Sequence, residues 1–201
     1  QSEGEQFGYL AVVYADLGET ARAIEHYESA IVIARAVGDL YLEAHMVGNL
    51  GIAYQTIGDG QQAIALMKQG LTMARKLGDR ENTGNGLSAL GHAYYTFGDT
   101  RQAAKCFEEA LAISREIGDG HGEAIALNFL GNASDNLGDT RQALSYYQHA
   151  LELSRKLADR RIEGTALGNL GLIYYNLGEY EKTVEYCSQS LTIRREIDDQ
   201  R

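Results

Sequence analysis

Asparagine side chains recur at regular spacing in this chain, and their chemistry suits hydrogen bonding to peptide groups. Seven of the eight asparagines fall at a few positions of a 40-residue period, namely Asn49, Asn85, Asn128, Asn132, Asn136, Asn169 and Asn176. Each amide offers a donor and an acceptor, so a row of them could bind the backbone of an extended peptide whatever its side chains. Asparagine is a poor helix former, which favours ligand contact here. The alternative is that some of these amides bridge neighbouring helices.

Aromatic, histidine and acidic residues share these positions. The predicted ligand-binding set is His45, Asn49, Asn85, His92, Tyr95, Asn128, Phe129, Asn132, Asp135, Asn169, Tyr175 and Asn176. Tyr95, Phe129 and Tyr175 have the chemistry of interface anchors, or they pack between repeats. His45 and His92 could make binding depend on pH near 6.5, or they are ordinary hydrogen-bonding histidines.

The charge of this predicted face differs from that of an ordinary solvated helix. Six positions in five repeats give thirty residues, and none of the chain's 18 lysines and arginines is among them. Glu5, Asp16 and Asp135 make the face mildly acidic, which favours a neutral or basic segment of a partner protein. The formal net charge of -10 argues against binding to nucleic acid or to an anionic membrane surface.

Motifs of known catalytic and metal sites do not occur. The sequence has no H-E-x-x-H, no C-x-x-C, no G-x-x-x-x-G-K and no nucleophile elbow. Acidic pairs such as Glu108-Glu109 fall on predicted solvated helix surface. We therefore predict no enzymatic activity, no catalytic residues, no cofactor and no metal.

The elements that position these side chains follow from the 40-residue period. Leucine recurs at Leu10, Leu50, Leu90, Leu130 and Leu170, and glycine, arginine and aspartate recur in the same register. Self-similarity at such a period is typical of stacked repeats. It predicts one array of five units, at residues 1–40, 41–80, 81–120, 121–160 and 161–200.

Each unit carries two helical patterns. Phe7, Leu10, Tyr14 and Leu17 are spaced by three, four and three residues, which predicts a helix with these side chains in the core. Apolar residues between 23 and 37 predict a second helix. The asparagine positions lie opposite the core face of the first helix. The chain is therefore predicted to be all-α, with about ten helices.

Glycine and aspartate mark the predicted helix ends. Gly18 and Gly38 suit left-handed helix ends, and Asp39 suits the cap of the next helix. Arg35 lies four residues before Asp39, which predicts a salt bridge or a carbonyl cap at each repeat. Gly51 is expected to let the two helices of its hairpin cross closely, facing Ala63.

The cysteines and the hydropathy pattern bear on the cellular compartment. Cys106 and Cys187 lie about two repeats apart, too far for a disulfide, and Cys187 falls at a core position where we expect it to be buried. No transmembrane span or signal peptide is visible. We expect a cytoplasmic protein.

The repeat unit resembles the tetratricopeptide repeat (TPR). The second unit carries the Leu-Gly, Tyr, Gly, Ala and small-residue pattern at Leu50, Gly51, Tyr54, Gly58, Ala63 and Gly70. The departures from the pattern are Ala11, Ser134, Thr183 and Ser190, together with the absence of proline. The forty-residue form is similar to Pins-type adaptors and to arrays of signalling proteins. The resemblance implies a right-handed α-solenoid of five hairpins, whose first helices line a concave groove.

The resemblance and the asparagine-rich face together predict a function. We expect a non-catalytic scaffold that binds a peptide or helical segment of a partner protein in the groove. The alternative is a sensor or packing arm of a larger multidomain signalling protein, such as a bacterial regulator, which could self-associate end to end. The chain begins with Gln1 and ends in the same repeat register, so we expect a fragment of a longer protein.

Overall fold

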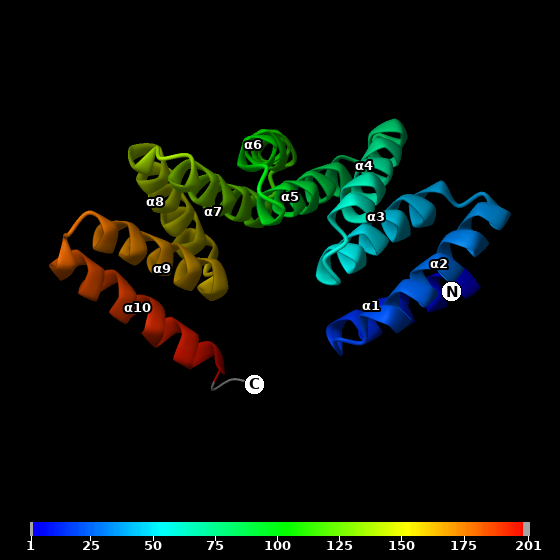
Figure 1. Cartoon of the computed structure of the whole chain (residues 1–201), viewed down its shortest axis with the longest axis horizontal. Helices are drawn as coiled ribbons and strands as arrows, with labels where there is room; N and C mark the ends of the chain where they lie inside the picture. Colours follow the sequence, from blue (N-terminus) through cyan, green and yellow to red (C-terminus); the bar gives the residue numbers. More distant parts are fainter. Residues whose placement is uncertain (1, 199–201) are drawn as a thin grey trace. The chain divides into compact units, whose positions relative to one another are not determined.

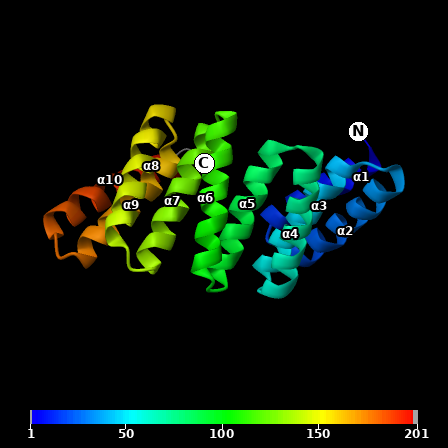
Figure 2. The same ribbon diagram turned by 90° about the horizontal axis from the view of Figure 1, so that it is seen from above.

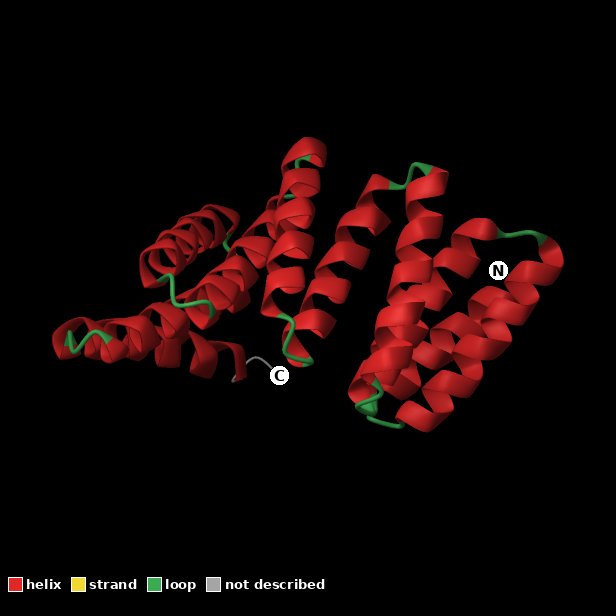
Figure 3. Cartoon of the chain, turned by 45° about the horizontal axis from the view of Figure 1, so that its top comes forward, coloured by secondary structure: helices red, strands yellow, loops and turns green. Residues whose placement is uncertain are grey.

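The chain folds into α-helices joined by short loops. The computed structural model describes residues 2–198, and within this range it contains ten helices and no strand (Figures 1 and 3). The helices are α1 (Glu3–Asp16), α2 (Thr20–Val37), α3 (Leu40–Thr56), α4 (Gly60–Leu77), α5 (Arg80–Thr96), α6 (Thr100–Ile117), α7 (Gly120–Asn136), α8 (Thr140–Leu157), α9 (Arg160–Asn176) and α10 (Tyr180–Asp198). The predicted all-α class is confirmed. None of the described helices is long and apolar enough to cross a membrane.

The chain divides into two compact units. The first, Gln1–Asp99, holds α1 to α5, and the second, Thr100–Arg201, holds α6 to α10. Within the first unit α3 contacts both α1 and α5, while α2 and α4 each pack against the odd-numbered helices beside them. Within the second unit α7 contacts α9, and α6, α8 and α10 pack in the same way (Figure 2). In both units the odd-numbered helices therefore lie in one row.

The helix ends form as the glycine and aspartate pattern predicts. Gly38 ends α2 in the left-handed region, with φ of 74°. The Asp39 carboxylate caps α3 by accepting a hydrogen bond of 3.0 Å from the Leu42 N–H. The same cap recurs at Asp79, Asp119 and Asp159. Ala158 is an exception, because it holds the left-handed position of the glycines with φ of 55°.

Gly51 of α3 lies where α3 and α4 cross closely. A Cβ added to Gly51 would lie 3.0 Å from the Ala63 carbonyl oxygen and 2.8 Å from Cγ of Met67. The predicted approach of Gly51 to Ala63 is therefore confirmed. Val47 and Leu50 of the same helix are buried with Tyr27 of α2 in one apolar cluster.

The predicted core was wrong at one repeat position and at one further residue. Leu17 and its equivalents Ile57, Phe97, Leu137 and Leu177 are exposed by 40% to 65%, because they follow the last residue of each odd-numbered helix. Leu10 is also exposed, whereas Leu50, Leu90, Leu130 and Leu170 are buried. Leu10 differs because α3, α5, α7 and α9 each pack on the even-numbered helix before them, whereas no described helix precedes α1.

Cys187 is exposed, contrary to its predicted burial. Its Sγ faces α9, since a Cβ added to Gly171 would lie 2.5 Å from it. No described helix covers the other side of α10, so the core position remains open. No disulfide joins Cys187 to Cys106.

The repeated arginine has a different partner from the predicted one. Arg35 Nε lies 2.6 Å from Glu43 Oε1, and Arg115 and Arg155 make the same contact with Glu123 and Glu163. The partner therefore lies eight residues later, on the next helix. The predicted Arg35–Asp39 pair fails because the Asp39 carboxylate is engaged in capping α3.

Candidate functional site

A pocket lies between α3 and α5 in the first unit, and we call it the α3–α5 pocket. Its volume is about 130 Å³. It is lined by Ala44, His45, Gly48, Asn49 and Ile52 of α3, by Met67, Gly70, Leu71 and Ala74 of α4, and by Asp79, Asn82, Asn85, Gly86 and Ala89 of the α5 segment. The floor is apolar, since Met67 and Leu71 are buried.

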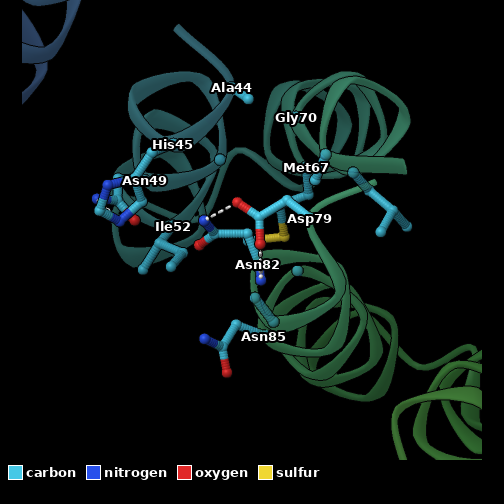
Figure 4. A pocket seen from close by; sticks show the side chains of 14 residues that line it. Ala44, His45, Asn49, Ile52, Met67, Gly70, Asp79, Asn82 and Asn85 are labelled. Carbon is cyan, nitrogen blue, oxygen red and sulfur yellow. Dashed lines mark hydrogen bonds between the residues drawn. The ribbon is translucent and has the colours of Figure 1, made fainter. Parts of the chain in front are cut away.

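The rim of the α3–α5 pocket carries amides in different states (Figure 4). Asn82 is held by Asp79, whose carboxylate accepts from its backbone N–H at 3.0 Å and from Nδ2 at 2.7 Å. Asn49 Nδ2 lies 3.4 Å from Nε2 of His45 on the same helix. The exposed Asn85 side chain makes no hydrogen bond with any residue from 2 to 198, and Figure 4 shows it pointing away from Asp79. Asn85 is therefore available to a ligand.

A second pocket lies between α7 and α9, and we call it the α7–α9 pocket. Its volume is about 410 Å³. It is lined by His121, Ile125, Asn128, Phe129, Asn132, Asp159, Arg161, Ile162 and Thr165. The lining includes both apolar and polar side chains, so the pocket has a surface for an apolar side chain and partners for hydrogen bonds.

The carboxylate of Asp159 is fixed at one side of the α7–α9 pocket. His121 Nδ1 lies 2.7 Å from Asp159 Oδ2, and the Ile162 N–H donates to Oδ1 at 3.0 Å. Partial burial raises the pKa of Asp159, but the hydrogen bonds from Ile162 and His121 outweigh burial and hold it below its ordinary value. Asp159 is therefore a charged group at neutral pH.

Asn128 carries the only buried side-chain oxygen or nitrogen without a hydrogen-bond partner among residues 2–198. The residue is 6% exposed and its Nδ2 donates to the Ala124 carbonyl at 3.3 Å, while Oδ1 has no donor. An unsatisfied buried acceptor costs about 1–3 kcal/mol. This cost is located at the wall of a pocket.

Asn132 and Phe129 take part in packing within the second unit. The Asn132 Oδ1 accepts from the Tyr147 hydroxyl at 2.7 Å and from Asn169 Nδ2 at 3.3 Å, so it bridges α7 to α8 and α9. The Phe129 ring stacks on Phe107, with centroids 4.9 Å apart. The alternatives of interhelical bridging and of aromatic packing therefore apply to these residues, although both also line the α7–α9 pocket.

The structure divides the predicted site residues into three groups. His45, Asn49 and Asn85 line the α3–α5 pocket, and Asn128, Phe129 and Asn132 line the α7–α9 pocket. Outside both pockets lie His92, Tyr95, Asp135, Asn169, Tyr175 and Asn176.

Of the residues outside the pockets, three have clear local partners, and one of them is Asn169, which donates to Asn132. His92 Nδ1 lies 2.9 Å from Gln55 Nε2, which links α5 to α3. Tyr175 is exposed and its ring lies 6.1 Å from that of Tyr180. His92 thus behaves as an ordinary hydrogen-bonding histidine.

Sequence reasoning missed several pocket residues. Asp79 and Asn82 belong to the start of α5, where the D-x-x-N spacing signals a helix cap, and their position at a pocket follows only from the packing of α3. Arg161 lines the α7–α9 pocket from the first turn of α9, at a repeat position outside the thirty of the predicted face, so this pocket contains a cation that the predicted face does not. Gly86 could have been singled out from the sequence, because a glycine inside a predicted helix, where no turn requires it, is unusual.

No three histidine, cysteine, aspartate or glutamate residues between positions 2 and 198 lie close enough together to hold a metal ion. The polar groups of the two pockets are mostly amides. They offer hydrogen bonds rather than a pair of titratable groups for proton transfer.

Comparison with known proteins identifies the repeat. Models of the tetratricopeptide repeat match residues 7–76, 42–116 and 82–156, and a further one matches 165–196. No curated protein matches the chain in sequence.

Solved structures share the fold at low sequence identity. RapI in its apo form is similar over 98% of this chain and 72% of its own, with TM-score 0.87 and 18% identity. A signal transduction ATPase with numerous domains from Pyrococcus horikoshii, which has a tetratricopeptide repeat sensor, matches 96% of this chain with TM-score 0.84 and 23% identity. This chain spans only 30% of that protein.

A putative kinesin light chain from Podosopora anserina, with nearly identical TPR-like repeats, matches 96% of this chain and 95% of its own, with TM-score 0.77 and 19% identity. These likenesses confirm the α-solenoid fold of helical hairpins. Since the family models together cover most of its length, the chain belongs to the tetratricopeptide repeat family.

Proposed function

We propose that this chain is a non-catalytic protein-interaction scaffold that binds a segment of a partner protein along its odd-numbered helices. One observation carries the proposal. Each of the two compact units has a pocket between successive odd-numbered helices, and asparagine amides lie at the rim or the wall of both pockets. A repeated arrangement of donors and acceptors beside apolar surface suits a peptide backbone with apolar side chains.

The charge around the α3–α5 pocket supports a neutral or basic segment. Asp79 lines it, and neither lysine nor arginine does. In the α7–α9 pocket Arg161 faces the same space as Asp159, so the preference for positive charge is weaker there. Among the solved structures of the same fold, a Rap protein is complexed with competence and sporulation factor, which supports the proposed class of partner.

Asparagine variants test the proposal. Peptides selected from a random display library on the wild-type chain serve as probes, and Asn49 and Asn85 are replaced together by alanine. Because Asn85 makes no hydrogen bond within the described chain, stability should hardly change while affinity falls at least about tenfold. Gln61→Ala, at an exposed position of α4 away from the pocket, is the matched control. A library that yields no binder, or an affinity that the double variant leaves unchanged, counts against the scaffold.

A second role rests on a different observation. The helix α10 exposes Val184 and Leu191, which are 66% and 49% accessible, and its Cys187 stands at a core position of the repeat. We propose that this side of α10 packs on another helical element, either in a larger signalling protein or on a second copy of the chain. Light scattering separates the two, because a mass equal to one chain at high concentration excludes the second copy.

A further inference from the structure

The α3–α5 pocket owes its existence to two glycines that no backbone constraint requires. Gly48 and Gly86 lie inside α3 and α5, and neither has a positive φ. A Cβ added to Gly48 would meet no atom within 4 Å, and one added to Gly86 would make ordinary contact with Leu71 at 3.6 Å. A glycine inside a helix costs about 1 kcal/mol relative to alanine. Packing does not account for either residue.

Other glycines of the same helices are constrained by packing. A Cβ on Gly51 would collide with the Ala63 carbonyl, and one on Gly70 would lie 3.0 Å from the Ala44 carbonyl oxygen. Those glycines allow close helix crossing. A Cβ on Gly48 would instead meet open space, and one on Gly86 would make only ordinary contact with Leu71.

The preceding repeat shows what fills this space. Forty residues before Gly48 and Gly86 stand Gly8 and Met46. Met46 is buried, and its Sδ would lie 2.9 Å from a Cβ on Gly8, so the methionine side chain runs from α3 across the glycine of α1. It packs in the apolar cluster with Ala30 and Ile31.

The α3–α5 interface has similar surrounding residues to the α1–α3 interface, but it lacks the methionine. Leu71 and Gly70 stand where Ile31 and Ala30 stand one repeat earlier, and Gly86 stands where Met46 does. In the second unit the equivalent positions of α7 and α9 hold Asn128 and Ala166, and both residues are buried. Of the three interfaces between odd-numbered helices within the units, this one has a small residue on both sides.

We propose that the slot between Gly48 and Gly86 receives one methionine- or leucine-sized apolar side chain of the partner, in the place that Met46 fills in the preceding repeat. The inference rests on the proposed function and names the side chain that the partner must supply. The volume of about 130 Å³ equals the share of about four water molecules in liquid water, which is enough for one such side chain. The apolar floor of Met67 and Leu71 favours an apolar side chain in the slot, while Asn49 and Asn85 at the rim bind the flanking peptide groups.

A small probe tests the slot independently of the rest of the partner. N-acetyl-methionine methylamide is titrated into the full chain, and methyl and amide NMR signals of Met67, Gly48 and Gly86 are followed. We expect shifts at all three residues and binding about tenfold tighter than that of N-acetyl-alanine methylamide, which leaves most of the slot empty. Equal binding of the two probes, or no shift at these residues, overturns the proposal.

Two filling variants provide the control. Gly86→Met places the side chain of Met46 in the slot from α5, and Gly48→Met fills it from α3. Both should fold at least as stably as the wild type, since each replaces a mid-helix glycine, and both should lose the probe-induced shifts. A folded Gly86→Met chain that still binds the methionine probe contradicts the assignment.

Display selection separates this proposal from the proposed function. Peptides selected on the wild type should share a methionine- or leucine-sized residue and should bind Gly86→Met at least tenfold more weakly. Peptides that bind both chains equally refute the slot and leave the scaffold intact. Failure to select any binding peptide refutes the scaffold, and the slot with it.

Discussion

Gly48 and Gly51 lie three residues apart on α3, and replacing each by alanine should change stability in opposite directions. In a helix interior the substitution gains about 1 kcal/mol at either site. At Gly48 nothing opposes this gain, because the added Cβ meets no atom within 4 Å. At Gly51 the Cβ would lie 3.0 Å from a backbone oxygen and 2.8 Å from the buried Met67, and such overpacking costs about 1–3 kcal/mol. We expect Gly48→Ala to stabilise by about 1 kcal/mol and Gly51→Ala to destabilise by up to about 2 kcal/mol.

Thermal melting followed by circular dichroism measures the difference. For a chain of this size each kcal/mol shifts Tm by about 2–4 °C, so a difference of about 1–3 kcal/mol between the two variants should separate their Tm values by about 2–12 °C. Hydrogen exchange of the α3 amides localises the effect, because each repeat interacts only with its neighbours. Two variants that melt together would refute the reasoning, since they would show that Gly48 is as constrained as Gly51.

Three further substitutions test other local arguments. Ala158→Gly should raise the free energy of unfolding by about 1 kcal/mol in a denaturant titration, because alanine is strained at φ of 55°; a decrease would contradict this. Asp159→Asn keeps a capping side chain but removes a carboxylate whose pKa is lowered, so its stability deficit relative to the wild type should be present at pH 7 and disappear as the pH falls well below about 4. A deficit that persists at pH 2 would exclude the pairing with His121 as its cause. Asn128→Leu removes the unpartnered Oδ1 at the cost of the bond to Ala124, and should raise stability by about 1 kcal/mol while weakening peptide binding; a lower Tm would show that the amide is satisfied.

The repeat pattern was sufficient to predict the helices and their caps. Gly38 and Asp39 carry local information, because a left-handed helix end and a helix cap each depend on a few adjacent residues. The partner of Arg35 could not be read in the same way. Two acidic residues lie within reach, and only the packing of α3 brings Glu43 to the guanidinium while Asp39 is used as a cap.

The candidate site was predictable by position but not by role. The asparagine positions reach both pockets, yet the same amide type bridges helices at Asn132 and stays unbonded at Asn85. That difference depends on what the neighbouring helices present, Tyr147 of the same repeat and Asn169 of the next, so the partners lie 15 and 37 residues away in the sequence. Periodicity gives the face of a helix, and the pairing of residues across helices decides what that face does.

The α3–α5 pocket and the α7–α9 pocket differ in how an opening is combined with a stable helix pair. In the first, two glycines give up helix stability and leave a space with an apolar floor, at a cost of about 1 kcal/mol each. In the second, Asn128 fills the interface but leaves an oxygen unpartnered, at a cost of about 1–3 kcal/mol. The repeat does not need glycine or asparagine at these positions in order to fold. The equivalent interface of α1 and α3 is closed by one ordinary side chain, that of Met46. A binding segment that supplied an apolar side chain to the first pocket would recover part of this energy, so its affinity would come from completing packing that the chain leaves incomplete.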